Sequence, residues 1–168
     1  MVMLFQVIKQ ENVGHLQHIQ MVIIQSKKVN SKDKHFQKSS MNIVNFFGNI
    51  KDKQFPLLVK IIDACNDLSV QVHPNDEYAA LHENSLGKTE CWYVLDCKED
   101  TKMVMGHHAK TKEELVKAIE NDDYDHLLNK FDIKKGDFFY IPSGTIHAIC
   151  KGSMIYEAQQ SSDITYRV

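Results

Sequence analysis

The sequence lacks any run of about 18 or more apolar residues, so it predicts no transmembrane helix. The apolar residues 1–5 are not preceded by basic residues or followed by a small-residue cleavage site, and we expect no signal peptide. Acidic and basic residues nearly balance, at a net charge of −2, so no broad basic field would attract nucleic acid or an anionic membrane. We therefore expect a globular protein with neither kind of partner.

Paired cysteines are also missing. Cys65, Cys91, Cys97 and Cys150 form no C-x-x-C spacing and sit among apolar or strand-forming residues. This pattern predicts reduced, packed thiols and a cytoplasmic protein rather than a disulfide-bonded secreted one. With 168 residues, of which 43% are hydrophobic, the chain is long enough for one domain with a substantial core.

One stretch, residues 68–74, combines polar and apolar side chains in alternation. On a strand, Ser69, Gln71 and His73 point from one face, and the two intervening valines point from the other. A hydroxyl, an amide and an imidazole on one face suit the lining of a pocket. Pro74 ends the strand because it has no backbone N–H.

Two later stretches are candidate partners for it. Residues 89–95 are rich in β-formers and place Glu90 and Trp92 on one side of a strand. Residues 136–147 predict a hairpin, in which an apolar strand enters a Pro-Ser-Gly turn and His147 opens the next strand.

Together these stretches offer two imidazoles, one carboxylate and one amide oxygen, from His73, His147, Glu90 and Gln71. The set suits a divalent metal such as zinc, although an amide is a less usual zinc ligand than a histidine or a carboxylate. A single carboxylate leaves the bound ion with net positive charge, which favours Lewis-acid chemistry.

Residues 136–147 also match the second cupin motif: glycine, five residues, proline, one residue, glycine, two residues, histidine. With the blocks "FPLLVKIIDACNDLSVQVHPNDEYA" and "LGKTECWYVLD", the chain from about residue 47 onward resembles type I mannose-6-phosphate isomerase in its short bacterial form. The resemblance implies an all-β, cupin-type jelly-roll barrel with a few short peripheral helices. It also implies that Gln71, His73, Glu90 and His147 bind Zn²⁺.

The resemblance divides the chain in two. Residues 47–168 correspond to the cupin domain, which ends earlier than in the usual short form, and a short helix is expected at residues 42–47. Residues 1–46 lack the opening strands of the family and contain a lysine-rich stretch, so we expect them to be divergent or poorly ordered.

The activity implied is the interconversion of mannose 6-phosphate and fructose 6-phosphate through a cis-enediol, with a small sugar phosphate as substrate. Glu157, Lys88 and Arg167 match family positions for acid–base and charge-stabilising work, and Ser69, Lys88 and Arg167 match substrate contacts. From the residues alone, a solvated strand residue remains the alternative for Glu157, and Ser69 and Lys88 could equally serve a surface or a turn.

Two other functions stay open. A metal-dependent oxygenase of the cupin class would normally have two histidines spaced by one residue, and Gln71 occupies the first of those positions, which argues against it. A non-catalytic remnant would keep the metal ligands without turnover. The oligomeric state is not predicted.

Individual elements have local signals. Residues 55–64 form a nearly continuous apolar run, which predicts a strand buried on both faces. We expect strands at residues 102–106 and 154–160 and helical turns within residues 122–129. Asn75 is placed to cap a short helix.

A second helix is expected to begin after Thr111. Thr111 and Glu114 have the spacing of a capping box, in which each side chain bonds the backbone N–H of the other. Leu115, Ala118 and Ile119 then share one helix face.

Overall fold

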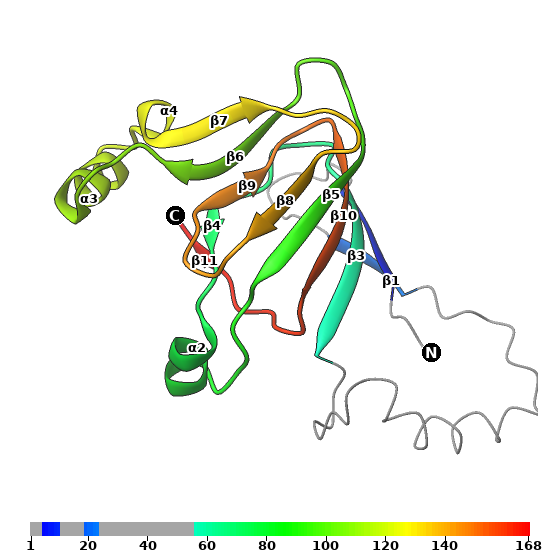
Figure 1. Ribbon diagram of the computed structural model, residues 1–168, viewed down its shortest axis with the longest axis horizontal. Coiled ribbons are helices and arrows are strands. Elements are labelled where there is room, and N and C mark those ends of the chain that lie inside the picture. The colour runs from blue at the N-terminus through cyan, green and yellow to red at the C-terminus, as the bar shows by residue number, and fades with distance from the viewer. Residues whose placement is uncertain (1–4, 11–18, 24–55) are drawn as a thin grey trace, which may run out of the picture.

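The computed structural model describes residues 5–10, 19–23 and 56–168, whose regular structure is mainly β-strand (Figure 1). The strands in chain order are β1 (Phe5–Gln10), β2 (Ile19–Ile23), β3 (Leu57–Asp63), β4 (Gln71–Val72), β5 (Glu90–Cys97), β6 (Lys102–His107), β7 (Leu128–Asp132), β8 (Phe138–Ile141), β9 (His147–Ile149), β10 (Ser153–Gln160) and β11 (Tyr166–Arg167). Three short helices complete the described elements: α2 (Asp76–His82), α3 (Lys112–Glu120) and α4 (Tyr124–Leu127). None of them is long and apolar enough to cross a membrane.

The strands form two sheets. The first, sheet A, has the order β2-β1-β3-β10-β5-β8, and the second, sheet B, has the order β11-β4-β9-β6-β7. Neighbouring strands are antiparallel except for β1 and β3, which are parallel. Over the described residues the two sheets do not join into one closed barrel.

The main core lies between the two sheets. It contains Trp92, Ile155 and Ile141 from sheet A and Met103 and Ile149 from sheet B, each at most 1% exposed. Strand β10 shows how the sequence builds this core, because its residues alternate between buried and more exposed along the whole strand. The period of two places one side of each strand against the other sheet.

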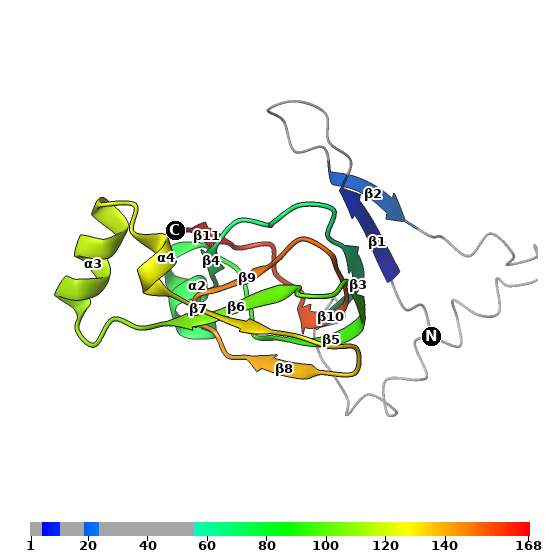
Figure 2. The same cartoon turned by 90° about the horizontal axis from the view of Figure 1, so that it is seen from above.

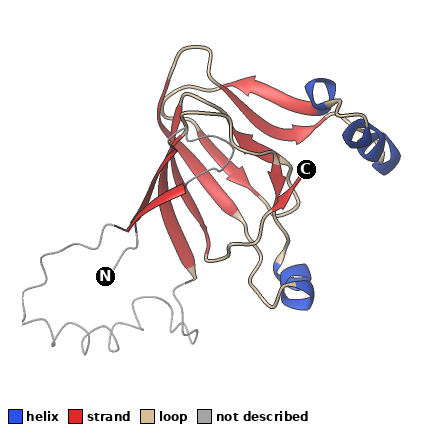
Figure 3. Ribbon diagram, turned by 180° about the vertical axis from the view of Figure 1, so that it is seen from behind, coloured by secondary structure: helices blue, strands red, loops and turns tan. Residues whose placement is uncertain are grey.

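A second apolar cluster covers the outer side of sheet B, where α3 and α4 lie at the edge of the molecule (Figure 3). Leu115, Ala118 and Ile119 of α3 pack there, as predicted from their spacing. The N-terminus of α3 is only half a capping box. Thr111 Oγ1 accepts from the Glu114 N–H, but the Glu114 carboxylate accepts from the Lys110 N–H instead of that of Thr111.

Helix α2 connects the end of β4 to β5. Asn75 caps it as predicted, since its side-chain oxygen accepts from the Tyr78 N–H at 2.8 Å. Asp76 Oδ1 accepts from the Gly87 N–H, also at 2.8 Å, and a Cβ on Gly87 would lie 2.5 Å from the backbone of Asn75. This close approach fixes where the chain enters Lys88 and β5.

Three expectations about strands need correction. The strand expected over residues 68–74 is reduced to Gln71–Val72. On either side of β4 the backbone forms isolated hydrogen bonds to different segments instead of a continuous ladder with one strand. Leu68 N–H donates to the Ile149 carbonyl, and the His73 carbonyl accepts from Gly144 N–H.

The predicted hairpin at residues 136–147 is also wrong. Strand β8 pairs with β5 in sheet A, whereas β9 pairs with β4 and β6 in sheet B. Pro142 cannot donate to a ladder, and Gly144 adopts a φ of 84° in the turn, so the segment carries the chain from one sheet to the other. This crossing brings the His147 side chain close to the Glu90 side chain.

Strand β3 forms where expected, but it is not buried on both faces. Ile62 is its one fully buried residue, and Leu57 is 52% exposed. On the same outward side of sheet A, Tyr93, Phe138 and Tyr140 are 43%, 62% and 64% exposed. We call Leu57, Tyr93, Phe138 and Tyr140 the outer aromatic face.

Two segments of the N-terminal region join sheet A. β1 and β2 form an antiparallel pair, and β1 continues the sheet beside β3 (Figure 2). The helix expected at residues 42–47, and most of residues 1–46, lie outside the described residues.

Removal of core volume tests this packing. Ile155→Ala should lower the free energy of unfolding by about 2–5 kcal/mol, because Ile155 is completely buried between the sheets. Leu81→Ala, at a position 77% exposed on α2, should change it by less than about 0.5 kcal/mol. Urea unfolding followed by circular dichroism measures both, and equal losses would contradict this core.

Candidate metal centre

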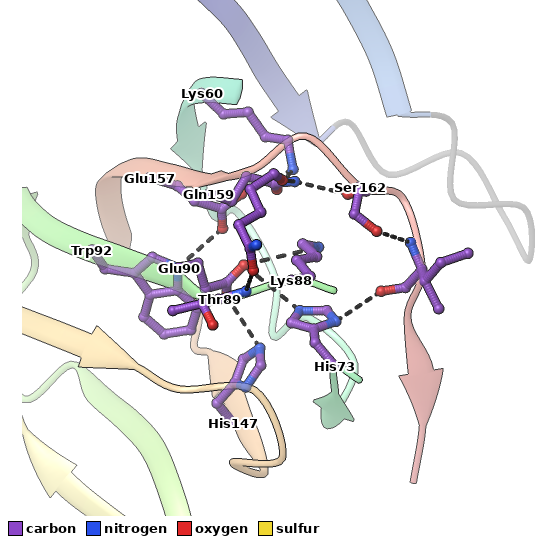
Figure 4. Close-up of polar contacts among 12 residues, drawn as sticks. Lys60, His73, Lys88, Thr89, Glu90, Trp92, His147, Glu157, Gln159 and Ser162 are labelled. Atoms are coloured by element: carbon purple, nitrogen blue, oxygen red, sulfur yellow. Dashed lines mark hydrogen bonds and ion pairs between the residues drawn. The ribbon is translucent and has the colours of Figure 1, made fainter. Parts of the chain in front are cut away.

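Three side chains converge between the sheets (Figure 4). His73 follows β4, Glu90 opens β5 and His147 opens β9, so the group joins sheet A to sheet B. Their exposed fractions are 2%, 2% and 0%, and their ligand atoms all lie within 4.8 Å of one another. Sequence analysis predicted these three residues as metal ligands, and the fold brings them together.

Backbone carbonyls orient both imidazoles. His73 Nδ1 lies 3.0 Å from the Ile164 carbonyl oxygen, and His147 Nδ1 lies 2.8 Å from that of Thr145. Since a carbonyl oxygen can only accept, each Nδ1 carries the proton and donates it. The Nε2 atoms then face Glu90, at 3.6 Å from Oε2 for His73 and 3.2 Å from Oε1 for His147.

Within the part of the chain that the structure describes, these facing atoms have no hydrogen-bond partner. His73 Nε2, His147 Nε2 and both carboxylate oxygens of Glu90 are buried and unpaired. Burial, together with the nearby Lys88 ammonium, lowers the pKa of His73 to about 3, so the His73 imidazole is neutral at neutral pH. A neutral imidazole nitrogen and a carboxylate oxygen repel each other unless a proton or a cation lies between them, and both are common ligands of divalent metals.

Gln71 lies in register with this group. In the antiparallel pairs it is opposite His147 on β9 and opposite Arg167 on β11. Residues directly opposite each other project from the same face of a sheet, so the three side chains form one row. Gln71 is half-buried and Arg167 is exposed, which places the arginine at the solvent end of the row.

Lys88 is buried beside Glu90. It is 6% exposed, and its Nζ lies 3.9 Å from Glu90 Oε2. Burial lowers the pKa of the Lys88 ammonium, and the nearby Glu90 carboxylate opposes that shift. The alternative of a surface role for Lys88 is therefore wrong.

Glu157 is held from two sides. It is 4% exposed, its Oε1 lies 2.9 Å from Lys60 Nζ, and its Oε2 accepts from the Trp92 indole N–H at 3.0 Å. The alternative of a solvated glutamate is wrong as well. Lys60, Glu157 and Trp92 are direct neighbours in register across β3, β10 and β5.

Lys60 and Gln159 are contacts that sequence reasoning did not assign to the site. Lys60 Nζ donates to Gln159 Oε1, and the Gln159 amide donates to the carbonyls of Gln160 and Ser162 at 2.9 and 2.8 Å. Gln159 lies opposite Glu90 in the sheet. The sequence did contain a signal for this contact: a single lysine inside the apolar run of β3, because a buried cation needs a polar or acidic partner.

Ser69 is half-buried, and neither Ser69 nor Arg167 forms a side-chain hydrogen bond or ion pair within residues 56–168. A cavity of about 340 Å³ is lined by His73 itself, together with Val72, Tyr78, Gly144 and Tyr166.

A profile of the family described as phosphomannose isomerase type I, catalytic domain, matches residues 9–100, more than half of the chain. The chain belongs to this family. The profile match begins at residue 9, whereas the motifs that carry the resemblance begin at about residue 47.

Curated relatives in the phosphomannose isomerase family agree with this assignment. Mannose-6-phosphate isomerase ManA of Bacillus subtilis is 58% identical over 125 residues, which are 74% of this chain and 40% of the relative. Mannose-6-phosphate isomerase of Streptococcus mutans is 62% identical over 122 residues, which are 73% of this chain and 39% of the relative. The chain thus spans about two fifths of the length of these relatives.

The crystal structure of mannose 6-phosphate isomerase from Bacillus subtilis superposes with a TM-score of 0.72 at 48% identity, covering 77% of this chain and 42% of that one. This likeness to a phosphomannose isomerase confirms the predicted all-β, cupin-type fold. Crystal structures of Salmonella typhimurium phosphomannose isomerase variants, such as one with a TM-score of 0.58 at 16% identity, show the same fold.

Titration of chelator-treated protein with Zn²⁺ tests the metal centre. Wild type should bind one ion per chain, and Glu90→Gln should bind at least about tenfold more weakly, because it keeps the shape of the side chain but removes its charge. His126→Ala is the control, since its side chain is 88% exposed. Calorimetry showing equal affinities for wild type and Glu90→Gln would contradict the assignment.

Proposed function

We propose that this chain carries the metal centre of a zinc-dependent aldose–ketose isomerase that interconverts mannose 6-phosphate and fructose 6-phosphate. The observation that carries the proposal is the buried set of unpaired acceptors on His73, Glu90 and His147. Family membership and the names of the relatives support the substrate, and the chain's share of their length makes the activity of the whole protein part of the proposal.

The residues fit a zinc ion. His73, Glu90 and His147 would hold it, and Gln71, in register with His147, would supply the fourth ligand. When bound, the ion supplies a Lewis acid for the sugar's hydroxyl and carbonyl oxygens. The two carbonyl contacts at Nδ1 keep both imidazoles in the tautomer that such a role requires.

The reaction moves a proton between C1 and C2 of the sugar through a cis-enediol, so it needs a group that accepts and returns a proton. Lys88 is the better placed of the two buried candidates. Both carboxylate oxygens of Glu157 already accept hydrogen bonds, from Lys60 and Trp92, whereas Lys88 only approaches Glu90. Glu157 is proposed to hold charge and orientation on the same wall.

Positive charge around the centre suits an anionic substrate. Arg167 lies at the exposed end of the row through Gln71, where its planar guanidinium can bind phosphate or a developing oxyanion in a bidentate way. We keep Ser69 as a proposed substrate contact because it precedes this row by two residues.

All proposed site residues lie within residues 47–168, which we therefore propose as the metal-binding domain. The pairing of β1 with β3 shows that part of residues 1–46 belongs to the same sheet. The four cysteines are free, which supports the proposed cytoplasmic location.

A coupled isomerase assay on the purified protein tests the function. Turnover of mannose 6-phosphate should disappear with a chelator and return with Zn²⁺. Lys88→Ala should lower kcat by about 100-fold or more, the usual size of a general acid–base contribution. Lys102→Ala is the matched control, because Lys102 forms a surface ion pair with Asp132.

Zinc binding at one per chain without any turnover would instead support the non-catalytic alternative. Equal kcat for Lys88→Ala and Lys102→Ala would contradict the role given to Lys88 while leaving the activity in place.

A further inference from the structure

The single tryptophan of the chain is buried at one side of the candidate site (Figure 4). Trp92 lies on the inward side of β5 with 0% exposure, two residues after Glu90. An apolar core position needs only bulk, but a buried indole also needs a hydrogen-bond acceptor for its N–H. The contacts of Trp92 therefore indicate the role of its indole N–H.

Its N–H holds Glu157. The indole donates to Glu157 Oε2 at 3.0 Å, while Lys60 engages Oε1 from the other side at 2.9 Å. The three residues are in register on adjacent strands, so the carboxylate lies between a donor on β5 and a cation on β3. Hydrogen bonds to a charged acceptor are the stronger kind, and two of them fix the carboxylate group.

Its ring packs against a metal ligand. The centroids of Trp92 and His147 are 5.3 Å apart with an interplanar angle of 79°, an edge-to-face contact. The Thr145 carbonyl already fixes Nδ1 of the same imidazole. The indole therefore contacts both His147, a proposed metal ligand, and Glu157.

We propose that Trp92 is a positioning residue with two separable parts: its ring sets the orientation of His147 for metal binding, and its N–H sets the orientation of Glu157 for turnover. The part played by the N–H rests on the proposed function, whereas the part played by the ring concerns metal binding alone. Both parts act through another residue, and neither requires contact with the substrate.

Two substitutions separate the parts. Trp92→Phe keeps an aromatic ring beside His147 and removes the N–H, so Zn²⁺ affinity should stay within about threefold while kcat falls about 10- to 100-fold, the usual effect of losing a hydrogen bond to a charged group. Trp92→Leu removes both, so Zn²⁺ affinity should also fall about 10- to 100-fold. Tyr93→Phe, on the outward side of the same strand, is the control and should change neither quantity.

A double-mutant cycle separates positioning from loss of packing. If the N–H acts through Glu157, Trp92→Phe should lower kcat in wild type but not in a Glu157→Gln background. Equal losses in both backgrounds would overturn this half of the proposal. Calorimetry with Zn²⁺ decides the other half, since parallel losses of affinity and of thermal stability in Trp92→Phe and Trp92→Leu would indicate packing alone.

Intrinsic fluorescence gives a readout independent of turnover. Because Trp92 is the only tryptophan, its emission reports this contact alone, and it should change and saturate at one Zn²⁺ per chain, with paramagnetic Co²⁺ quenching it. Calorimetric binding without any change in emission would overturn the coupling of the ring to His147. If the protein binds Zn²⁺ with the expected emission change but does not turn over mannose 6-phosphate, the proposed function is contradicted. The role of the ring in metal binding is then still supported.

Discussion

The candidate site depends on three buried side chains that turn hydrogen-bond acceptor atoms toward one another. The Glu90 carboxylate faces the Nε2 atoms of two imidazoles, because both Nδ1 atoms are engaged by backbone carbonyls. Such groups are stable together in a buried place only when positive charge lies among them. The crossing of the chain from β8 to β9, the short β4 and the carbonyl of Ile164 all serve to bring these atoms face to face. Through Ile164, the same constraint ties the C-terminal segment that carries Arg167 to His73.

Local patterns in the sequence predicted a large part of this arrangement. Alternation along β5, the cap at Asn75 and the apolar face of α3 depend on neighbours close in sequence, and they were confirmed. His73, Glu90 and His147 were predicted because each stands in a recognisable block. The errors arose where backbone partners are distant. Whether β8 and β9 pair with each other depends on β5 and β4, and no local signal gives that choice.

The contacts that were missed share the same physical cause. Lys60 and Glu157 are 97 positions apart, and only the register of β3 against β10 makes them partners. Local cations nevertheless explain how a chain with net charge −2 can suit an anionic ligand, since Lys60 and Lys88 come from different segments to the same site (Figure 4). The net charge of the chain therefore does not reveal the local positive potential that folding creates at the site.

The outer aromatic face has a practical consequence for work on this protein. Leu57, Tyr93, Phe138 and Tyr140 expose apolar surface on one side of sheet A, and two of them belong to β8, a strand at the edge of that sheet. Environment-sensitive dyes that fluoresce on apolar surfaces will stain this folded protein before any heating, so dye-based melting curves will start from a high baseline. A mild non-ionic detergent below its micelle concentration should lower that baseline by covering the face.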